Sequence, residues 1–453
     1  MSKKKWLLLF LCILLLAGYW KFFYKAYSET AVAKSADCIL ALDVKRVTNT
    51  VMWNILTAPG QWKKISYSRS SRISWKDMVK VPDYVFVFHS KDQPANAWYS
   101  SFQIKDEIGF INGLLFYHFE KGDSLPGLQV YFSVERSIVI VKSGNKILVG
   151  NNAVENKSYI IQVAKEMFLQ KRFIAREKLF KNVEASCHLS LVIEKNNFLQ
   201  DDAIVKMNFD RNAITVHALF SPKKQFAFSE NNFTCPVSPL CATGFTQPPA
   251  AVYNLLTADA KTKISKTINF NIDSLLLQSN HYYNLDIAGI TPRIDSAISY
   301  VYDDNFSKVE KVVVNKVMEP SFSLNIQGDS IAAIFNYWNN NGQFEKTASG
   351  TLFLPIPFVR SYCNKKNEHE LSIASGGFQN SSNIHSINCI FFFQMLLTAI
   401  PAEILKYLPA ELINSIENMA SVEITLKKSG ENIKLEGKFN KKENELPVLD
   451  LDR

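Results

Sequence analysis

The chain has 453 residues, of which 47 % are hydrophobic and 21 % are charged, and its net charge is +9 at pH 7. These values exclude a disordered chain, and the length exceeds the usual size of one compact domain, so two domains or one large bilobed body are expected. Five of the nine net charges come from lysines within the first 25 residues, which leaves +4 for residues 28–453. That balance excludes the concentrated basic footprint of a nucleic-acid-binding protein.

The amino terminus has the pattern of a membrane anchor. After three lysines, residues 6–20 (WLLLFLCILLLAGYW) carry no charge, and the apolar stretch reaches residue 24 when Lys21 extends to the lipid head groups. We therefore predict one transmembrane helix in an anchor over residues 1–27, in contact with the membrane through residues 6–24. The positive-inside rule keeps the first lysines in the cytoplasm. The remainder then lies on the periplasmic or extracellular side of the inner membrane.

Two alternatives stay open for this segment. A cleaved signal peptide would use small residues such as Ala31 and Ala33. A buried helix of a soluble protein would not need the basic flank. A lipoprotein signal is excluded, because Tyr19 stands where the lipidated cysteine would have to follow Leu-Ala-Gly.

Two phrases of the sequence resemble each other. SFQI at residues 101–104 precedes DEIGFINGL, and SLNI at residues 323–326 precedes a similar DSIAAIFNY. Each phrase predicts a strand that leads into a short helix, capped by Asp106 in the first case and by Asp329 in the second. An internal duplication is predicted because three more pairs follow in the same order. They are residues 38–43 with 268–273, residues 146–150 with 371–376, and the helix-like residues 163–182 with 389–418, each followed by a strand.

The predicted fold class is α+β, with two related lobes of mostly antiparallel sheet and amphipathic helices. Strand-like runs such as DYVFVFH and RSIVIVKS occur without a regular βαβ rhythm. We predict a first lobe at residues 28–228, a Pro-rich connector at 229–262, a second lobe at 263–442 and a tail at 443–453. The apolar run at residues 389–400 is too short to span a bilayer and is predicted as a buried helix, with a membrane-touching helix as the alternative.

Six cysteines lie outside the predicted anchor, an even number that permits disulfides in an exported protein. The short, proline-restricted sequence CPVSPLC makes Cys235 and Cys241 the best candidate pair. The alternative is that all six are buried small hydrophobic residues. The six are Cys38, Cys187, Cys235, Cys241, Cys363 and Cys389.

One group of residues has the chemistry of a zinc site. Cys363 and His369 flank a polar loop, and His385 and Cys389 are spaced as one helical turn. The first spacing is long for a zinc knuckle, an oxidising compartment disfavours paired thiolates, and the first half of the chain lacks equivalent ligands. We therefore assign no metal ligand, and expect a loop histidine with buried or bridged cysteines.

The sequence carries no phosphate loop, dinucleotide-binding glycine signature, nucleophile-elbow serine or HExxH motif. Cys187 and His188 are adjacent on a predicted strand, so their side chains point in opposite directions and do not form a dyad. We accordingly assign no catalytic residue, no cofactor-binding residue and no cofactor.

The layout resembles uncharacterised bacterial membrane-anchored, β-rich envelope proteins of a domain-of-unknown-function family. The resemblance rests on the Lys-rich start, one anchor, a duplicated β-rich body and the closing sequence IKLEGKFNKKENELPVL, with Asn-Glu-Leu at residues 444–446. It implies a location in the cell envelope and an α+β fold, and it brings no catalytic residues.

These features predict a non-catalytic envelope protein with a binding or scaffolding role. Its expected partners are the membrane and either another envelope protein or an apolar ligand, and not nucleic acid. One alternative is a carrier or binder of lipid or another apolar molecule, which a continuous apolar cavity with an open mouth would favour. The other alternative is an enzyme of unrecognised type, which requires convergent His, Asp or Glu side chains in a cleft.

Overall fold

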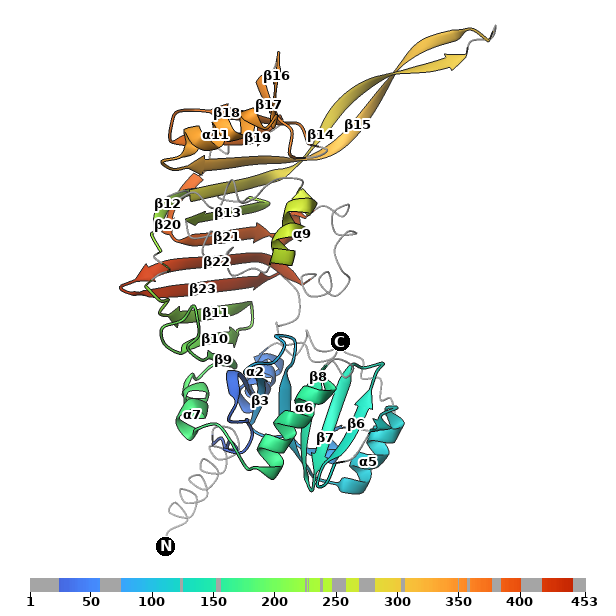
Figure 1. Ribbon diagram of the computed structural model, residues 1–453, viewed down its shortest axis with the longest axis vertical. Helices are drawn as coiled ribbons and strands as arrows, with labels where there is room; N and C mark the ends of the chain where they lie inside the picture. Colours follow the sequence, from blue (N-terminus) through green and yellow to red (C-terminus); the bar gives the residue numbers. More distant parts are fainter. Residues whose placement is uncertain are drawn as a thin grey trace. The chain divides into compact units, whose positions relative to one another are not determined.

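The chain divides into two compact units, and unit 1 ends at Ser221 where unit 2 begins at Pro222. Both consist mainly of antiparallel strands with a few helices, which confirms the predicted α+β class (Figure 1). The computed structural model describes residues 24–57, 75–122, 125–151, 156–224, 226, 228–236, 239–246, 258–268, 282–302, 306–348, 350–356, 359–376, 384–400 and 418–442.

Unit 1 is built on one antiparallel sheet with the strand order β5-β6-β7-β8-β4-β3-β1-β9-β10-β11, and β2 adds to β4. Its strands are β1 (Ala36–Asp43), β2 (Val79–Lys80), β3 (Tyr84–Ser90), β4 (Tyr99–Ile104), β5 (Glu120–Lys121), β6 (Gln129–Ser133), β7 (Ile138–Ser143), β8 (Lys146–Asn151), β9 (Leu189–Ile193), β10 (Ala203–Phe209) and β11 (Ala213–Phe220). Its helices are α2 (Val44–Thr57), α4 (Trp75–Met78), α5 (Glu107–Phe116), α6 (Lys157–Ala164), the π-helical turn η1 (Lys165–Leu169) and α7 (Arg176–Glu184).

Both faces of the central strands are covered, as the sequence of β7 requires. Its Ile-Val-Ile-Val run has no polar alternation, because Val139 and Val141 pack under α6, η1 and α7 on one face. Ile140 packs with Phe110 of α5 and Met78 of α4 on the other face. Burial of such side chains on both faces is the main favourable contribution to folding of this unit.

Unit 2 has a sheet with the strand order β16-β17-β18-β19-β15-β14-β13-β21-β22-β23 and a separate pair, β12 with β20. The strands are β12 (Asn231–Pro236), β13 (Cys241–Thr246), β14 (Tyr282–Tyr302), β15 (Lys308–Gln327), β16 (Phe344–Thr347), β17 (Gly350–Phe353), β18 (Ser361–Lys365), β19 (Glu370–Ser375), β20 (Ile384–Cys389), β21 (Phe391–Leu396), β22 (Met419–Ser429) and β23 (Asn432–Lys441). The helices are α9 (Ala258–Ile268), α11 (Ile331–Asn340) and the 3-10 turn η2 (Leu397–Ala399).

The two sheets share one strand order. In each unit a strand leads into a helix, four more strands follow, and the fourth of these pairs with the strand before the helix. In unit 1 these elements are β4, α5 and β5–β8, and β8 pairs with β4. In unit 2 they are β15, α11 and β16–β19, and β19 pairs with β15. The register agrees with the echoed phrases, because Ser101 lies opposite Leu148 and Ser323 lies opposite Ala374.

The connector predicted at residues 229–262 is wrong, since it contains β12, β13 and the start of α9. By its place in the strand order, β13 corresponds to β1, and not the predicted residues 268–273, of which 269–273 lie outside the described residues. The sequence CATGFT resembles a turn because of Gly244. That glycine is required by packing, because a Cβ there would lie 2.4 Å from Phe392 and 2.6 Å from Phe233.

The helix predicted at residues 389–418 is also wrong where the structure describes it. Residues 384–389 and 391–396 form β20 and β21, and only η2 follows before residue 401. The run of three phenylalanines has strong strand propensity, and β21 lies between β13 and β22 in the sheet. In the first half, residues 163–169 and 176–182 are helical, within α6, η1 and α7, whereas residues 170–175 between them are not.

The two predicted helix caps have different outcomes. Asp106 occupies the N-cap position of α5 without a side-chain capping hydrogen bond, whereas Ser330, not Asp329, precedes α11. Residues 1–23 of the predicted anchor and residues 443–453 of the predicted tail lie outside the described residues. Within the described ranges, no helix is both long enough and apolar enough to cross a bilayer.

Candidate functional site

The sheet of unit 1 opens between β3 and β4. These strands pair only at Val87 with Ser100 and at Phe88 with Tyr99, and then separate. Beyond the separation β4 pairs with the short strand β2 instead, through Val79 opposite Ile104. The segment between β2 and β3 contains Pro82, which has no N–H to donate to a ladder. The separation of β3 from β4 therefore leaves room for a cavity within an otherwise continuous sheet.

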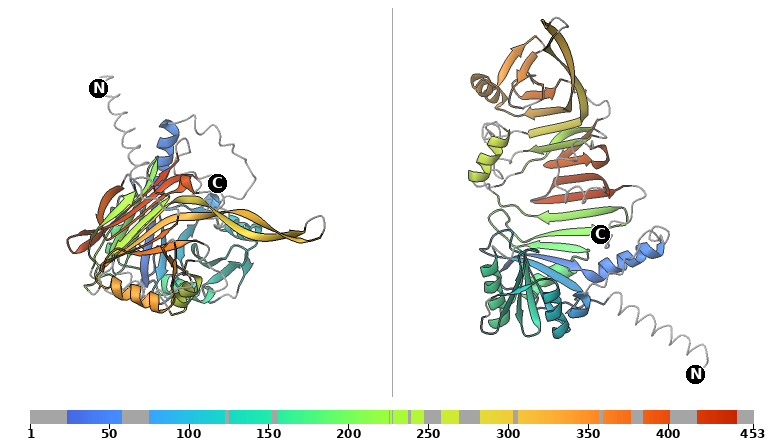
Figure 2. Two further views of the ribbon diagram at one scale, coloured as in Figure 1. Left: turned by 90° about the horizontal axis from the view of Figure 1, so that it is seen from above. Right: turned by 90° about the vertical axis from the view of Figure 1, so that its right-hand side faces the viewer.

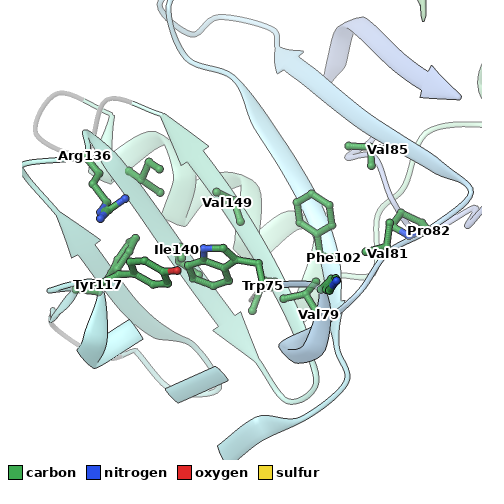
Figure 3. Close-up of a pocket in the computed structure, with 14 residues that line it drawn as sticks. Trp75, Val79, Val81, Pro82, Val85, Phe102, Tyr117, Arg136, Ile140 and Val149 are labelled. Atoms are coloured by element: carbon green, nitrogen blue, oxygen red, sulfur yellow. The ribbon is translucent and has the colours of Figure 1, made fainter. Parts of the chain in front are cut away.

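A cavity of about 340 Å³ lies at this gap, on the face that α4 and α5 cover (Figure 3). This volume is near the lower end of the usual range for small-molecule sites, roughly 300–1,000 Å³. In Figure 3, Arg136 and Tyr117 lie at one end of the cavity, Pro82 and Val85 lie at the other, and Trp75 lies between them. Its lining comprises Trp75, Lys76, Val79, Val81, Pro82, Val85, Phe102, Tyr117, Phe119, Arg136, Ile138, Ile140, Ile147 and Val149.

One wall of this cavity, which we call the sheet-gap pocket, is aromatic. The Trp75 and Tyr117 rings stack with centroids 5.3 Å apart and planes 12° from parallel. Phe110 of α5 meets Trp75 edge-on at 6.1 Å, and the Arg136 guanidinium lies 4.9 Å from the centre of the Tyr117 ring. These contacts fix the wall, because stacking and cation–π interactions both favour one ring orientation.

The chemistry of the sheet-gap pocket suits an apolar ligand. Of the fourteen residues that line it, Lys76 and Arg136 carry charge, and both are cations. Val81 and Trp75 are exposed to solvent, so apolar side chains reach the surface at the pocket. A ligand with an apolar body and an anionic end matches this arrangement.

A second cavity of about 450 Å³ lies on the other face of β4. It shares Val81, Pro82 and Phe102 with the sheet-gap pocket, which shows that the two cavities adjoin at the gap. Its lining is more polar, and burial together with Lys171 lowers the pKa of Lys146 there. The chain from residue 26 to residue 31 forms part of its wall, held by a hydrogen bond from the Ala26 N–H to Asp83 at 2.8 Å.

The four residues considered as metal ligands do not come together. Cys363 is buried in β18 beneath α11, and His369 is in the exposed turn between β18 and β19. His385 and Cys389 lie on strand β20, where four residues span about 13 Å instead of one helical turn. Among the described residues, no group of three or more His, Cys, Asp or Glu side chains could hold a metal ion.

The proposed Cys235–Cys241 disulfide is not formed. Cys235 is on β12, which pairs with β20, whereas Cys241 is on β13, between β14 and β21 in the main sheet. None of the six cysteines outside the predicted anchor forms a disulfide within the described part of the chain. Burial raises the pKa of Cys235 to about 12 and that of Cys389 to about 11, so these thiols are poor nucleophiles.

Cys187 and His188 also have structural roles. The Sγ of Cys187 donates to the Leu189 carbonyl, and burial raises its pKa. His188 Nδ1 accepts a hydrogen bond from the Phe209 N–H, its Nε2 lies 2.7 Å from Thr50 Oγ1, and burial lowers its pKa. A neutral histidine fixed by these partners is not paired with a reactive thiol.

The sheet-gap pocket was not foreseen from the sequence, because its residues come from five separated segments of unit 1, at residues 75–85, 102, 117–119, 136–140 and 147–149. Asp286 was also missed, although its environment is unusual. It lies on β14 at 8 % exposure, its Oδ1 has no hydrogen-bond partner within the described part of the chain, and burial raises its pKa to about 6. The sequence offered a single signal for it, an acidic residue at an inward position of an alternating strand.

No protein-family model matches the chain, and no curated protein matches it. Among solved structures, the chain is similar to three crystal forms of TP0453. Form III aligns with a TM-score of 0.27 at 12 % identity, over 54 % of this chain and 87 % of that chain. Form I gives 0.28 at 11 % identity, over 54 % and 86 %, and form IV gives 0.26 at 13 % identity, over 45 % and 83 %. Similarity at this level assigns neither fold nor function.

Proposed function

We propose that this protein is a non-catalytic binding protein of the bacterial cell envelope, and that unit 1 binds a lipid-like molecule. The apolar part of the ligand occupies the sheet-gap pocket, and an anionic end lies near Arg136. The observation that carries the proposal is the chemistry of the lining, which is apolar and aromatic apart from two cations. The enzyme alternative needs His, Asp or Glu side chains in a cleft, and the lining of this pocket includes none of these.

The start of the described chain supports a membrane source for the ligand. The predicted anchor ends at residue 27, and residues 26–31 line the cavity that adjoins the sheet-gap pocket. Lys25 forms an ion pair with Asp43, and Lys45 Nζ donates a hydrogen bond to the Tyr24 carbonyl. These contacts hold the start of the described chain beside the gap between β3 and β4. They therefore keep this gap close to the point where the predicted anchor would enter the bilayer. We propose the inner membrane as that bilayer, with the amino terminus in the cytoplasm.

We further propose that the two units derive from one duplicated ancestor. The shared strand order and the matching registers of β4 with β8 and of β15 with β19 support this origin. The core supports it as well, because Ile104 of β4 and Ile326 of β15 are both buried just before the helix that follows each strand. Binding in unit 1 is then a specialisation of one copy.

The proposal is tested by filling the sheet-gap pocket. Val149 lines it from β8, and a Val149→Trp substitution should occupy the space that an acyl chain needs. The full chain in amphipol is titrated with a fluorescent fatty acid, and the variant is expected to bind at least about tenfold more weakly. Val134→Trp is the matched control, because Val134 is exposed and does not line the pocket.

Circular dichroism and thermal unfolding establish that both variants are folded. Unchanged affinity in a folded Val149→Trp protein would contradict the proposal, and so would an equal loss in the Val134→Trp control. If Val149→Trp does not fold, Val85→Phe replaces it, because this substitution adds less volume and lies at the other end of the pocket. The same titration of Val85→Phe then tests whether filling the pocket weakens fatty-acid binding.

A further inference from the structure

The hairpin of β14 and β15 continues well beyond the sheet of unit 2. β13 pairs with β14 only over Tyr282–Ile287, and β19 pairs with β15 only over Ser323–Gln327. The two strands nevertheless remain paired with each other out to Tyr302 and Lys308. Figure 1 and the left view of Figure 2 show this ribbon leaving the rest of the unit. Along residues 308–320, the outer edge of β15 has no strand partner within the described ranges.

One face of this ribbon carries an exposed apolar patch. Ile298 lies opposite Val312, and the next pair on the same face is Ser296 with Val314. Ile298 is 63 % exposed, and Val312 and Val314 are each 64 % exposed. A two-stranded ribbon is marginally stable alone, and a long apolar strand edge is a template for pairing with another strand. The ribbon therefore has the properties of an interface that is covered in the assembled protein.

The order of residues along β15 identifies its partner. Residues 309–317 read VEKVVVNKV, in which the five valines are placed symmetrically about Val313. When two copies of this segment pair antiparallel about a two-fold axis at Val313, Val312 of one copy lies opposite Val314 of the other. Glu310 lies opposite Lys316, and by symmetry this ion pair forms twice.

Neighbouring registers are worse. Residues directly opposite each other in an antiparallel pair have their side chains on the same face of the sheet. A two-fold axis normal to the sheet must therefore pass between a residue and its own symmetry mate. The registers next to the one centred on Val313 are centred on Val312 and on Val314. An axis at Val312 places Lys308 opposite Lys316, which is repulsive. An axis at Val314 places Lys316 opposite Val312 and leaves Glu310 opposite Met318, so neither charge has a partner.

We propose that two copies of this chain associate through β15, antiparallel about Val313, to form a four-stranded sheet of β14-β15-β15-β14. Pro320 lies just beyond the paired segment, where it cannot donate to a ladder. The dimer places the valines of the two copies side by side on one sheet face and removes an exposed strand edge. It rests on the hairpin of unit 2 and is independent of the ligand proposed for unit 1.

A cysteine on the two-fold axis provides the first test. In the proposed register, Val313 of each copy faces Val313 of the other, so Val313→Cys should give a disulfide-linked dimer when the full chain in detergent is oxidised. Val317→Cys is the matched control on the same strand face, because the two Val317 positions lie about 26 Å apart along the strands. Wild type measures the background from the native thiols. Cross-linking of Val313→Cys that does not exceed both controls would overturn the proposal.

Exchange of the charges provides the second test. Glu310→Lys and Lys316→Glu each convert two attractive contacts into two repulsive ones, and each is expected to raise the dimer dissociation constant by about tenfold. The double variant restores the ion pairs in reversed order and should recover the wild-type value. Light scattering of the full chain over a concentration series measures these constants. A monomeric wild type at all concentrations, or a double variant no better than the single ones, would overturn the proposed pairing.

Discussion

The Trp75 ring lies 5.3 Å from the Tyr117 ring and nearly parallel to it, although 41 residues separate the two in sequence. Trp75 begins α4, and Tyr117 is the residue at the end of α5, so the stack connects the two helices that partly cover one face of the unit 1 sheet. The space that these helices leave open is the sheet-gap pocket. Ligand binding is therefore expected to depend on this pair.

Removal of the indole should weaken binding. Trp75→Ala deletes the pocket wall and one partner of the stack, and the affinity for a fluorescent fatty acid is expected to fall by about tenfold. Trp53→Ala serves as the control, because Trp53 is an exposed tryptophan of α2 in the same unit and does not line the pocket. An equal effect of the two substitutions on affinity would contradict a specific role for Trp75.

Arg136 should select for a negative charge on the ligand. Arg136→Gln is expected to lower the affinity for a fatty acid by about three- to tenfold at low salt, while the affinity for the corresponding fatty alcohol stays constant. The difference should shrink as ionic strength rises. Arg211→Gln, in the exposed turn between β10 and β11, is the matched control. A parallel loss for acid and alcohol would show that Arg136 contributes packing and not charge recognition.

Asp286 should make the stability of unit 2 depend on pH. Because burial raises the pKa of Asp286 to about 6 from an unfolded value of 3.8, the folded state binds the proton more tightly. Its contribution therefore favours folding below about pH 4 and is lost progressively as pH rises to about 6. Asp286→Asn should remove this dependence, and its stabilisation relative to wild type should be about 1–2 kcal/mol larger at pH 7 than at pH 4.5. Urea unfolding of both proteins at pH 4.5 and pH 7 measures this change in stability. A stability difference between variant and wild type that is equal at the two pH values would refute the raised pKa of Asp286.

Gly244 should tolerate no side chain. Gly244→Ala forces a methyl group against Phe233 and Phe392, and the free energy of unfolding should fall by about 1–3 kcal/mol. Gly289→Ala on β14 is the control, because a Cβ there would meet open space. Urea unfolding of the two variants should therefore give clearly different midpoints. Similar midpoints would mean that the aromatic pair can move aside without cost.

Local patterns in the sequence predicted the parts of the fold that depend on local chemistry. Runs of β-branched and aromatic residues identified β3 and β7, and the echoed phrases placed β4 and β15 in equivalent positions before their helices. Prediction failed where a tertiary contact decides the outcome. Gly244 resembles a turn residue until Phe233 and Phe392 are seen against it, and the phenylalanines of β21 suit a buried helix as well as a buried strand.

The candidate site could not be predicted, because no segment of the sequence contains it. The sheet-gap pocket depends on the separation of β3 from β4 after only two paired residues, which is a property of the assembled sheet. The zinc hypothesis failed for a related reason: the spacing of His385 and Cys389 is meaningful on a helix, and these residues lie on a strand. The spacing of two residues in the sequence identifies a metal site only when it is known whether they lie on a helix or on a strand.

Photolabelling tests the central claim, that unit 1 binds a lipid-like molecule in the sheet-gap pocket, most directly. The full chain is irradiated with a fatty acid that carries a diazirine on its acyl chain, and the labelled peptides are mapped by mass spectrometry. The account predicts labels on residues 75–85, 102 and 138–149, and their suppression by excess unlabelled fatty acid. Labels that spread over both units, or that persist under competition, would contradict it.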